Sequence, residues 1–173
     1  MQVCRFALVV MFALLSRTSA PQGAARPLDA RLRISFRGMG PVRVGMPLVE
    51  LQRVVPSLEV EPELTPGCTF ASSPTSSGAV AFMISSGLVA RTDVSERGFR
   101  TVSGAQVGDS EGRIKALYQG RVVVSEHAYA DGHYLTVQSN DRRFAAVFET
   151  DGKVVTSYRI GRVPEVLYIE GCS

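Results

Sequence analysis

The apolar residues of the chain follow two different spacings, one typical of helices and one typical of strands. Two stretches have helical spacing, the first at Leu48, Leu51, Val54 and Val55 and the second at Ile114, Leu117 and Tyr118. We predict that the first helix begins near Pro47 and that the second begins after Asp109 as its N-cap. Both helices are short, so they depend on packing against a larger element.

Segments typical of strands follow each predicted helix. In the first half they cover 58–62, 68–72, 79–85 and 88–94, and in the second half 121–129, 133–139, 142–150 and 153–160, with a last strand at 166–170. Asp131-Gly132 and Asp151-Gly152 are strong signals for two-residue hairpin turns. The pattern predicts an α+β fold in which a short helix packs on an antiparallel β-meander, twice in succession.

One sequence pattern occurs twice. Residues 44–55 align with 107–118, which places Gly45 on Gly108, and residues 82–90 align with 147–155. Each half is too small to bury a good core alone, so we interpret the pattern as a duplicated module. The expected boundaries are repeat 1 at 33–96 and repeat 2, with the C-terminal strand, at 97–173.

The N-terminus has the features of a secretory signal peptide. One cation, Arg5, precedes an apolar run at 6–15, and small residues follow up to Ala20. The apolar run is too short to span a bilayer. We expect residues 1–20 to be removed, residues 21–32 to form a flexible leader, and the mature protein to be periplasmic or secreted without stable membrane insertion.

Removal of the signal peptide changes the charge and the cysteine count. Arg5 and Arg17 leave with it, so 17 of the 19 Lys and Arg residues remain against 16 Asp and Glu. This near-neutral balance argues against a nucleic-acid partner. Cys68 and Cys172 remain, and in an oxidising compartment they are expected to form one disulfide rather than a metal site, because the chain has no Cys-x-x-Cys.

Two-residue turns would fix the strand pairing and therefore the two faces of the sheet. The face under the helices then carries apolar residues, among them Leu135, Val137, Ala146 and Phe148. The opposite face carries the candidate binding residues of the second half, His127, Tyr129, Tyr134, Thr136, Thr156 and Tyr158, and those of the first half, Phe82, Arg91 and Asp93. We interpret this face as a protein-binding surface, although such residues also suit any half-exposed strand.

The sequence does not favour an enzyme, a metal site or a cofactor site. His127 and His133 fall on opposite faces of the predicted sheet, which argues against a shared metal. Ser110 lies in G-D-S-E-G, which is not the G-x-S-x-G nucleophile motif. Two alternatives to a protein-binding module remain open: a module that binds glycans or small molecules, and a hydrolase with a carboxylate pair.

The stretch V-G-M-x-x-x-E at 44–50, followed by a helix and a meander, resembles the SmpA/OmlA small-lipoprotein domain of bacterial envelopes. The tandem layout resembles the β-lactamase-inhibitor-protein architecture. The wider stretch V-G-D-S-E…G-H-Y-L-T-V…F-E-T-D-G is similar to uncharacterised bacterial secreted proteins. The resemblance implies a concave protein-binding surface and another extracytoplasmic protein as the partner. The function it implies is that of an enzyme inhibitor or an envelope accessory protein.

Overall fold

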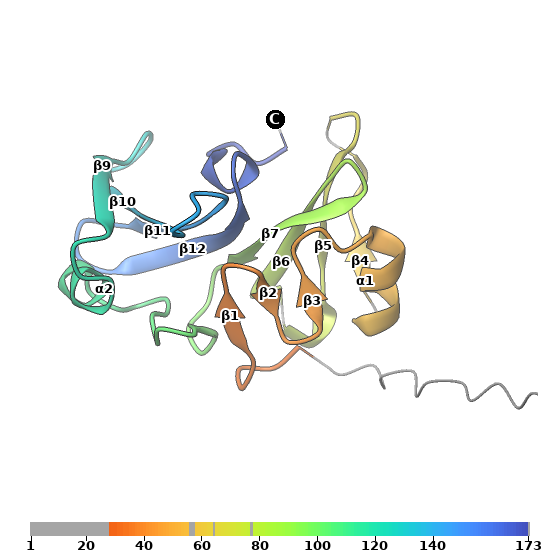
Figure 1. Cartoon of the computed structure of the whole chain (residues 1–173), viewed down its shortest axis with the longest axis horizontal. Coiled ribbons are helices and arrows are strands. Elements are labelled where there is room, and N and C mark those ends of the chain that lie inside the picture. The colour runs from red at the N-terminus through yellow and green to blue at the C-terminus, as the bar shows by residue number, and fades with distance from the viewer. Residues whose placement is uncertain (1–27, 56–57, 64, 77, 173) are drawn as a thin grey trace, which may run out of the picture.

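The computed structural model describes residues 28–55, 58–63, 65–76 and 78–172, so the predicted signal peptide lies outside the described residues. The fold is mixed α+β and mostly sheet, with two helices and two sheets, as predicted for its class (Figure 1). The larger sheet is antiparallel with the order β4-β5-β6-β7-β12-β11-β10-β9. Its strands are β4 (Glu59–Val60), β5 (Cys68–Ser72), β6 (Val80–Ser85), β7 (Leu88–Val94), β9 (Val122–Glu126), β10 (His133–Gln138), β11 (Phe144–Thr150) and β12 (Val155–Arg162).

A smaller four-stranded sheet packs beside the large one. Its order is β3-β2-β1-β8, with β1 (Arg33–Ser35), β2 (Gly38–Met39), β3 (Val42–Arg43) and β8 (Arg100–Thr101). The strands β1 and β8 are parallel, so the segment ahead of the first helix pairs with the segment ahead of the second. No helix in the described part of the chain is long and apolar enough to cross a membrane.

The two helices are α1 (Leu48–Val54) and α2 (Glu111–Leu117), close to their predicted positions. The N-cap of α2 is Ser110, whose Oγ accepts from the Arg113 N–H at 3.2 Å, so the prediction of Asp109 was wrong by one residue. A serine hydroxyl in this position satisfies one of the free N–H groups of the first turn.

Both helices are attached to the large sheet in the same way. Gly45 and Gly108 have φ values of +88° and +84°, a left-handed conformation that glycine adopts without steric cost. The Gly45 N–H donates to the Val89 carbonyl at 2.8 Å, and the Gly108 N–H donates to the Val155 carbonyl at 2.8 Å. In return the Val89 and Val155 N–H groups donate to the residue after each glycine, both at 2.9 Å.

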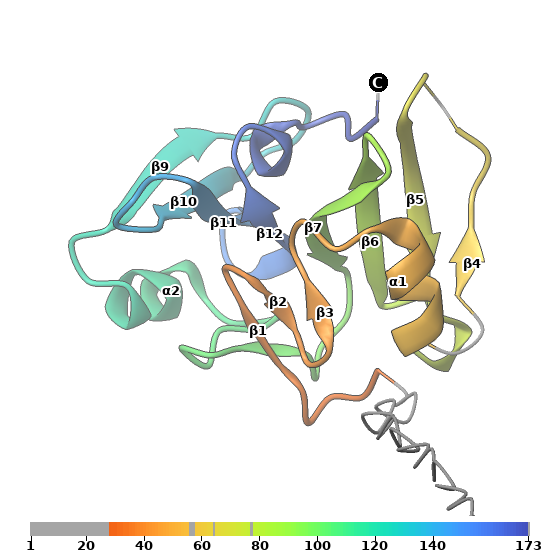
Figure 2. The same ribbon diagram turned by 45° about the vertical axis from the view of Figure 1, so that its right-hand side comes forward.

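The core lies between the helices and one face of the large sheet, which we call the inner face. Leu51 of α1 and Ile114 of α2 are fully buried in the same cluster as Phe82 and Phe148 of the sheet. Figure 2 shows α1 and the small sheet on the same side of the large sheet. Leu28 is also buried in this cluster, so the packed chain begins earlier than the expected end of the leader at residue 32.

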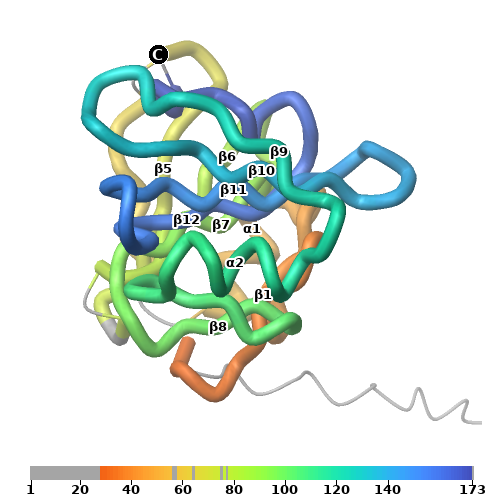
Figure 3. Tube along the Cα trace, turned by 90° about the vertical axis from the view of Figure 1, so that its left-hand side faces the viewer, coloured from red at the N-terminus to blue at the C-terminus, as the bar shows by residue number. Residues whose placement is uncertain are grey.

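The C-terminal segment, residues 163–172, crosses the opposite face of the large sheet, which we call the outer face. The structure has a 3-10 helix, η2 (Glu165–Leu167), where a strand at 166–170 was predicted. Figure 3 shows α2 and the C-terminal end on opposite sides of the strands. Val166 of this segment therefore packs on the sheet, and the segment does not extend the sheet as a further strand.

The strand registers differ from those expected for two-residue turns. A difference of an even number of residues keeps each side chain on its predicted face of the sheet, and an odd number moves it to the other face. A two-residue turn at Asn140-Asp141 predicts Leu135 opposite Ala146, but Leu135 pairs with Phe148. A shift of two residues leaves every side chain on its predicted face because side chains alternate along a strand. Leu135 and Phe148 are accordingly buried on the inner face, as predicted.

Two β-bulges shift the β11–β12 and β6–β7 registers by an odd number of residues. They place Tyr158 and Phe82 on the opposite face from the predicted one. Between β11 and β12 a bulge at Glu149/Thr150 pairs Phe148 with Tyr158, three residues beyond the predicted partner. Tyr158 is therefore 1% exposed in the core, and its hydroxyl donates to the Phe99 carbonyl at 3.0 Å. The placement of Tyr158 on the exposed face was wrong because a bulge adds one unpaired residue.

The same error affects the first half of the chain. A bulge at Met83/Ile84 pairs Phe82 with Thr92 rather than with Arg91. Phe82 is fully buried on the inner face, whereas Arg91 and Asp93 lie on the outer face. The prediction that all three residues share one exposed face was therefore wrong for Phe82, which lies on the inner face, and for Arg91, which is buried on the outer face.

Candidate binding surface

The outer face collects most of the remaining candidate residues. Tyr134, Thr136, Arg91 and Asp93 all lie on it by strand register, and the His127 ring stacks on Tyr134 with centroids 4.5 Å apart. Two further candidates lie at the edges of this face: Tyr129 in the loop between β9 and β10, and Thr156 at the bulge of β12, both of them exposed. The structure therefore brings together only part of the predicted set.

The middle of the outer face is covered by the chain itself. Tyr134, Ala145 and Val147 form a small apolar cluster with Val166 of the C-terminal segment. Tyr134 is 6% exposed, so it cannot offer its ring to a partner in this arrangement. The prediction of an exposed Tyr134 was wrong because the C-terminal segment packs over it.

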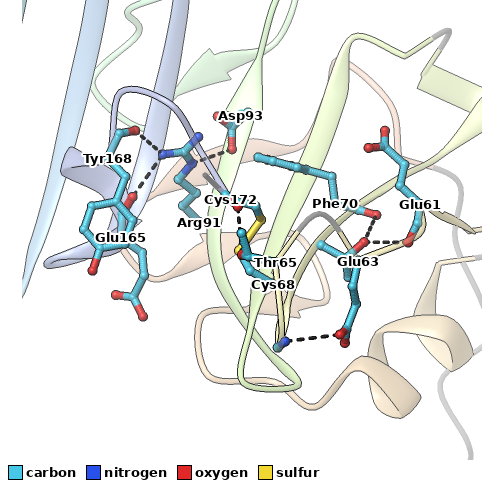
Figure 4. Close-up of a disulfide and its surroundings, with 12 residues drawn as sticks. Glu61, Glu63, Thr65, Cys68, Phe70, Arg91, Asp93, Glu165, Tyr168 and Cys172 are labelled. Atoms are coloured by element: carbon cyan, nitrogen blue, oxygen red, sulfur yellow. Dashed lines mark hydrogen bonds and ion pairs between the residues drawn. A yellow bond between two sulfur atoms is a disulfide. The ribbon is translucent and has the colours of Figure 1, made fainter.

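A buried arginine of β7 holds the C-terminal segment in place. Arg91 is 4% exposed, and its Nη1 donates to the carbonyls of Glu165 and Tyr168 at 2.9 and 2.8 Å. Its Nε donates to Asp93 Oδ2 at 2.9 Å (Figure 4). One guanidinium thus connects a central strand of the sheet to two backbone positions of the C-terminal segment.

A second buried arginine, on β12, also binds the backbone of the C-terminal segment. Arg159 is 5% exposed, and its Nε donates to the Val166 carbonyl at 2.8 Å. Its Nη1 makes an ion pair with Glu149, and the guanidinium carbon lies 5.7 Å from the centroid of the Tyr134 ring. The planar fork of an arginine can bind a carboxylate and a carbonyl at the same time, which a lysine cannot do with fixed geometry.

The disulfide predicted from the sequence fixes the end of the same segment. Cys68 of β5 and Cys172 form the bridge, with Cα atoms 5.4 Å apart. Next to it, the Thr65 hydroxyl donates to the Cys172 carbonyl at 2.8 Å (Figure 4). The C-terminal segment is therefore attached to the central strands β7 and β12 through the two arginines and to β5 through the disulfide.

The carboxylates at these anchor points have shifted pKa values. Burial raises the pKa of Asp93 above its ordinary value of 3.8, although Arg91 opposes the change. Burial also acts to raise the pKa of Glu165, but hydrogen bonds from Arg162 hold it below 4.5. Asp93 and Glu149 line one hollow of about 160 Å³, and each of them is paired with an arginine.

Three consecutive apolar side chains of the anchored segment are exposed to solvent, followed by the exposed Glu170. Leu167, Tyr168 and Ile169 are 40%, 45% and 45% exposed. Tyr129 is 72% exposed, and its hydroxyl donates to the Glu170 carboxylate, which joins the loop to the same region. We call Tyr129, Leu167, Tyr168 and Ile169 the apolar tip.

Three of the four residues of the apolar tip were not predicted from the sequence. Residues 166–170 have strand-like composition, so they were expected to pair in the sheet rather than to be exposed. The useful signal was Pro164 directly ahead of them, since a proline there disfavours a continuous strand. In the described residues, no three His, Cys, Asp or Glu side chains are placed to hold a metal ion.

Comparison with known proteins gives a fold relative but no family. No protein-family model matches the chain, and no curated protein matches it. The fold is similar to the crystal structure of the uncharacterized protein yfeY from Escherichia coli, with a TM-score of 0.53 and 14% sequence identity. The match covers 75% of this chain and 99% of that chain, so the similarity concerns the fold alone.

Proposed function

We propose that this protein is a non-enzymatic binding module that acts outside the cytoplasm and recognises another protein through the apolar tip. One observation carries the proposal: apolar side chains are exposed on a segment whose backbone is tightly anchored. Leu167 and Ile169 directly follow the Val166 and Tyr168 carbonyls, which Arg159 and Arg91 bind. Exposed apolar groups on a fixed backbone are typical of recognition surfaces.

The anchoring favours binding because it removes an entropic cost. A loop that must be ordered on association loses part of its binding energy to that ordering. Here two guanidinium groups and a disulfide hold the segment before any partner arrives. Tyrosine adds a large contact area with few rotatable bonds, as Tyr129 and Tyr168 do in the apolar tip.

We also propose that the fold arose by tandem duplication. Outward from the central β7–β12 pair, the first half runs β7-β6-β5-β4 and the second half runs β12-β11-β10-β9. Both halves therefore place their strands in the same order. The matching hydrogen bonds of Gly45 and Gly108 to Val89 and Val155 support the same relation. A duplicated scaffold of this kind is consistent with the binding architecture that the sequence resembles.

The extracytoplasmic location rests on the cysteine pair. A disulfide that closes a sequence separation of 104 residues persists in an oxidising compartment and is rare in the cytosol. The signal-peptide pattern at residues 1–20 supports the same location.

Affinity capture from an extracytoplasmic extract tests the function, with the oxidised protein lacking residues 1–20 as bait. The double substitution Tyr168→Ala and Ile169→Ala should lower the affinity for a captured protein by about 2 kcal/mol, or roughly 30-fold in Kd. Val102→Ala and Val49→Ala are matched controls, since these residues are 65% and 56% exposed elsewhere. The proposal fails if the control variants weaken binding equally, or if the double variant binds as tightly as the wild type.

A further inference from the structure

A second candidate site lies away from the apolar tip, where the turn between β10 and β11 meets the end of β12. Figure 3 shows this turn projecting from the body of the protein. A hollow of about 470 Å³ opens beside it, within the size range of small-molecule sites. Three arginines line the hollow, Arg142, Arg143 and Arg162, together with the apolar side chains of Phe144 and Val163.

The charge of the hollow is positive after its own ion pairs are taken into account. Arg162 donates to Glu165 Oε1 at 2.8 Å, so its charge is matched within the protein. Across the residues that the structure describes, Arg142 and Arg143 make no ion pair. The nearest carboxylate on the turn, Asp141, accepts from the Ser139 hydroxyl and pairs with Arg37 at 3.7 Å. Neither guanidinium is held in an ion pair within the described part of the chain, although the Asp141 carboxylate interacts electrostatically with Arg143 and offsets part of its charge.

The backbone of Arg142 has a left-handed conformation that glycine would adopt more easily. Its φ is +56°, in the left-handed region, and its N–H donates to the Ser139 carbonyl at 2.9 Å to close the turn. Glycine or asparagine is favoured in such a position, and another side chain there stores strain. A glycine at position 142 would keep the turn and remove the side chain, so Arg142→Gly separates the role of the side chain from that of the backbone.

We propose that this hollow binds a phosphate monoester carried on an organic group. The doubly anionic phosphate matches the two unpaired guanidinium groups in charge. Arginine also binds phosphate oxygens in a bidentate manner, which fits its planar fork. Phe144 and Val163 supply an apolar wall for the organic part, and the Arg143 guanidinium lies 5.9 Å from the Phe144 ring centroid.

The source of the phosphate can be resolved with three probes, measured by titration calorimetry or vesicle co-sedimentation. The probes are inorganic phosphate, glucose 1-phosphate, and phosphatidic acid in phosphatidylcholine vesicles. We expect one of the organic phosphates to bind more tightly than inorganic phosphate, and to bind more weakly at high salt because exposed charges are screened. Binding to glucose 1-phosphate identifies a soluble ligand, whereas binding to the vesicles alone identifies a lipid headgroup.

Two variants separate a ligand role from a structural role. Arg142→Gly should raise the urea midpoint, because it relieves the backbone strain, and should weaken phosphate binding at least tenfold. Ser86→Gly is the matched control, since Ser86 has φ +53° in the turn between β6 and β7. It should raise the urea midpoint and leave phosphate binding unchanged. Arg143→Gln should also weaken binding at least tenfold.

Three results would overturn the proposal. The first is the absence of binding to all three probes at about 10 mM, a concentration that detects even millimolar affinity. The second is phosphate binding by Arg142→Gly that equals that of the wild type. The third is tighter binding to a polyglutamate peptide than to any phosphate, which would indicate an acidic protein as the ligand instead.

Discussion

The replacement Arg91→Met tests how the apolar tip is held in place. Methionine keeps an unbranched apolar side chain of similar length in the buried site but removes every donor. The wild-type guanidinium makes three hydrogen bonds, to Asp93 at 2.9 Å and to the carbonyls of Glu165 and Tyr168 at 2.9 and 2.8 Å. In the variant Asp93 and the Tyr168 carbonyl lose this donor, whereas the Glu165 carbonyl keeps the Tyr168 N–H at 3.2 Å.

The expected loss of stability is about 3 kcal/mol. Removing one partner of a buried ion pair costs about 3–5 kcal/mol, because the other charge stays buried without compensation. Here the lower end applies, because the Asp93 side chain is 27% exposed and water can reach part of it. With an m-value near 2 kcal/mol/M, the urea midpoint should fall by about 1.5 M.

Both pH and a second substitution should modify the loss. Without Arg91 the pKa of Asp93 rises further, so the folded state holds a proton that the unfolded state releases near 3.8. The stability of the variant should therefore fall as the pH rises above about 4, until Asp93 also ionises in the folded state. Adding Asp93→Asn should recover about 1 kcal/mol or more, because it removes the uncompensated carboxylate.

Urea unfolding followed by circular dichroism gives the global effect, and hydrogen exchange of the 165–170 amides gives the local one. Those amides should exchange faster in Arg91→Met than any in the sheet. Arg100→Met is the control, because Arg100 is exposed and its side chain donates to Gln106 at 3.0 Å, and its effect should stay within about 0.5 kcal/mol. A loss below about 1 kcal/mol in Arg91→Met, or one equal to that of the control, would refute the reasoning.

Three further predictions concern the packing of the fold. Burial acts to raise the pKa of Glu111, but hydrogen bonds from Thr150 and His133 hold it below 4.5, so stability should be lost as the pH falls through that lowered pKa. Glu111→Gln should reduce this acid sensitivity in urea unfolding at pH 3 to 6, and an unchanged pH profile would contradict the assignment. Tyr158→Phe should cost about 1–2 kcal/mol in urea unfolding because a buried hydrogen bond is lost, whereas a solvent-exposed Tyr158 would show no loss. Replacing both cysteines of the bridge by serine should cost up to about 4.7 kcal/mol for a separation of 104 residues, and free thiols in the untreated protein would contradict the bridge.

The helices and most strands could be predicted because their signals are local. The spacing that buries Leu51 and Ile114, and the glycines at positions 45 and 108, depend only on nearby residues. The same holds for the cysteine pair, whose inference needed only the expected compartment. These features are determined by short stretches of chain, so the sequence alone specified them.

The faces of the sheet needed more than local signals. Leu135 stayed on its predicted face although its partner differed by two residues, whereas one bulge moved Tyr158 into the core. A bulge adds a single residue, and a single residue reverses the direction of every side chain beyond it. No turn sequence in the chain signals where these bulges fall, so the sequence left this choice open.

By itself the sequence determined the fold class, the approximate positions of the helices and nearly all strands, and the residues able to form a disulfide. Only the tertiary structure decided which residues of the outer face reach solvent. Arg91 and Arg159 draw the C-terminal segment over Tyr134 and turn Leu167, Tyr168 and Ile169 outward. The contacts responsible join residues about 75 positions apart in the case of Arg91, and their geometry exists only after the sheet has formed.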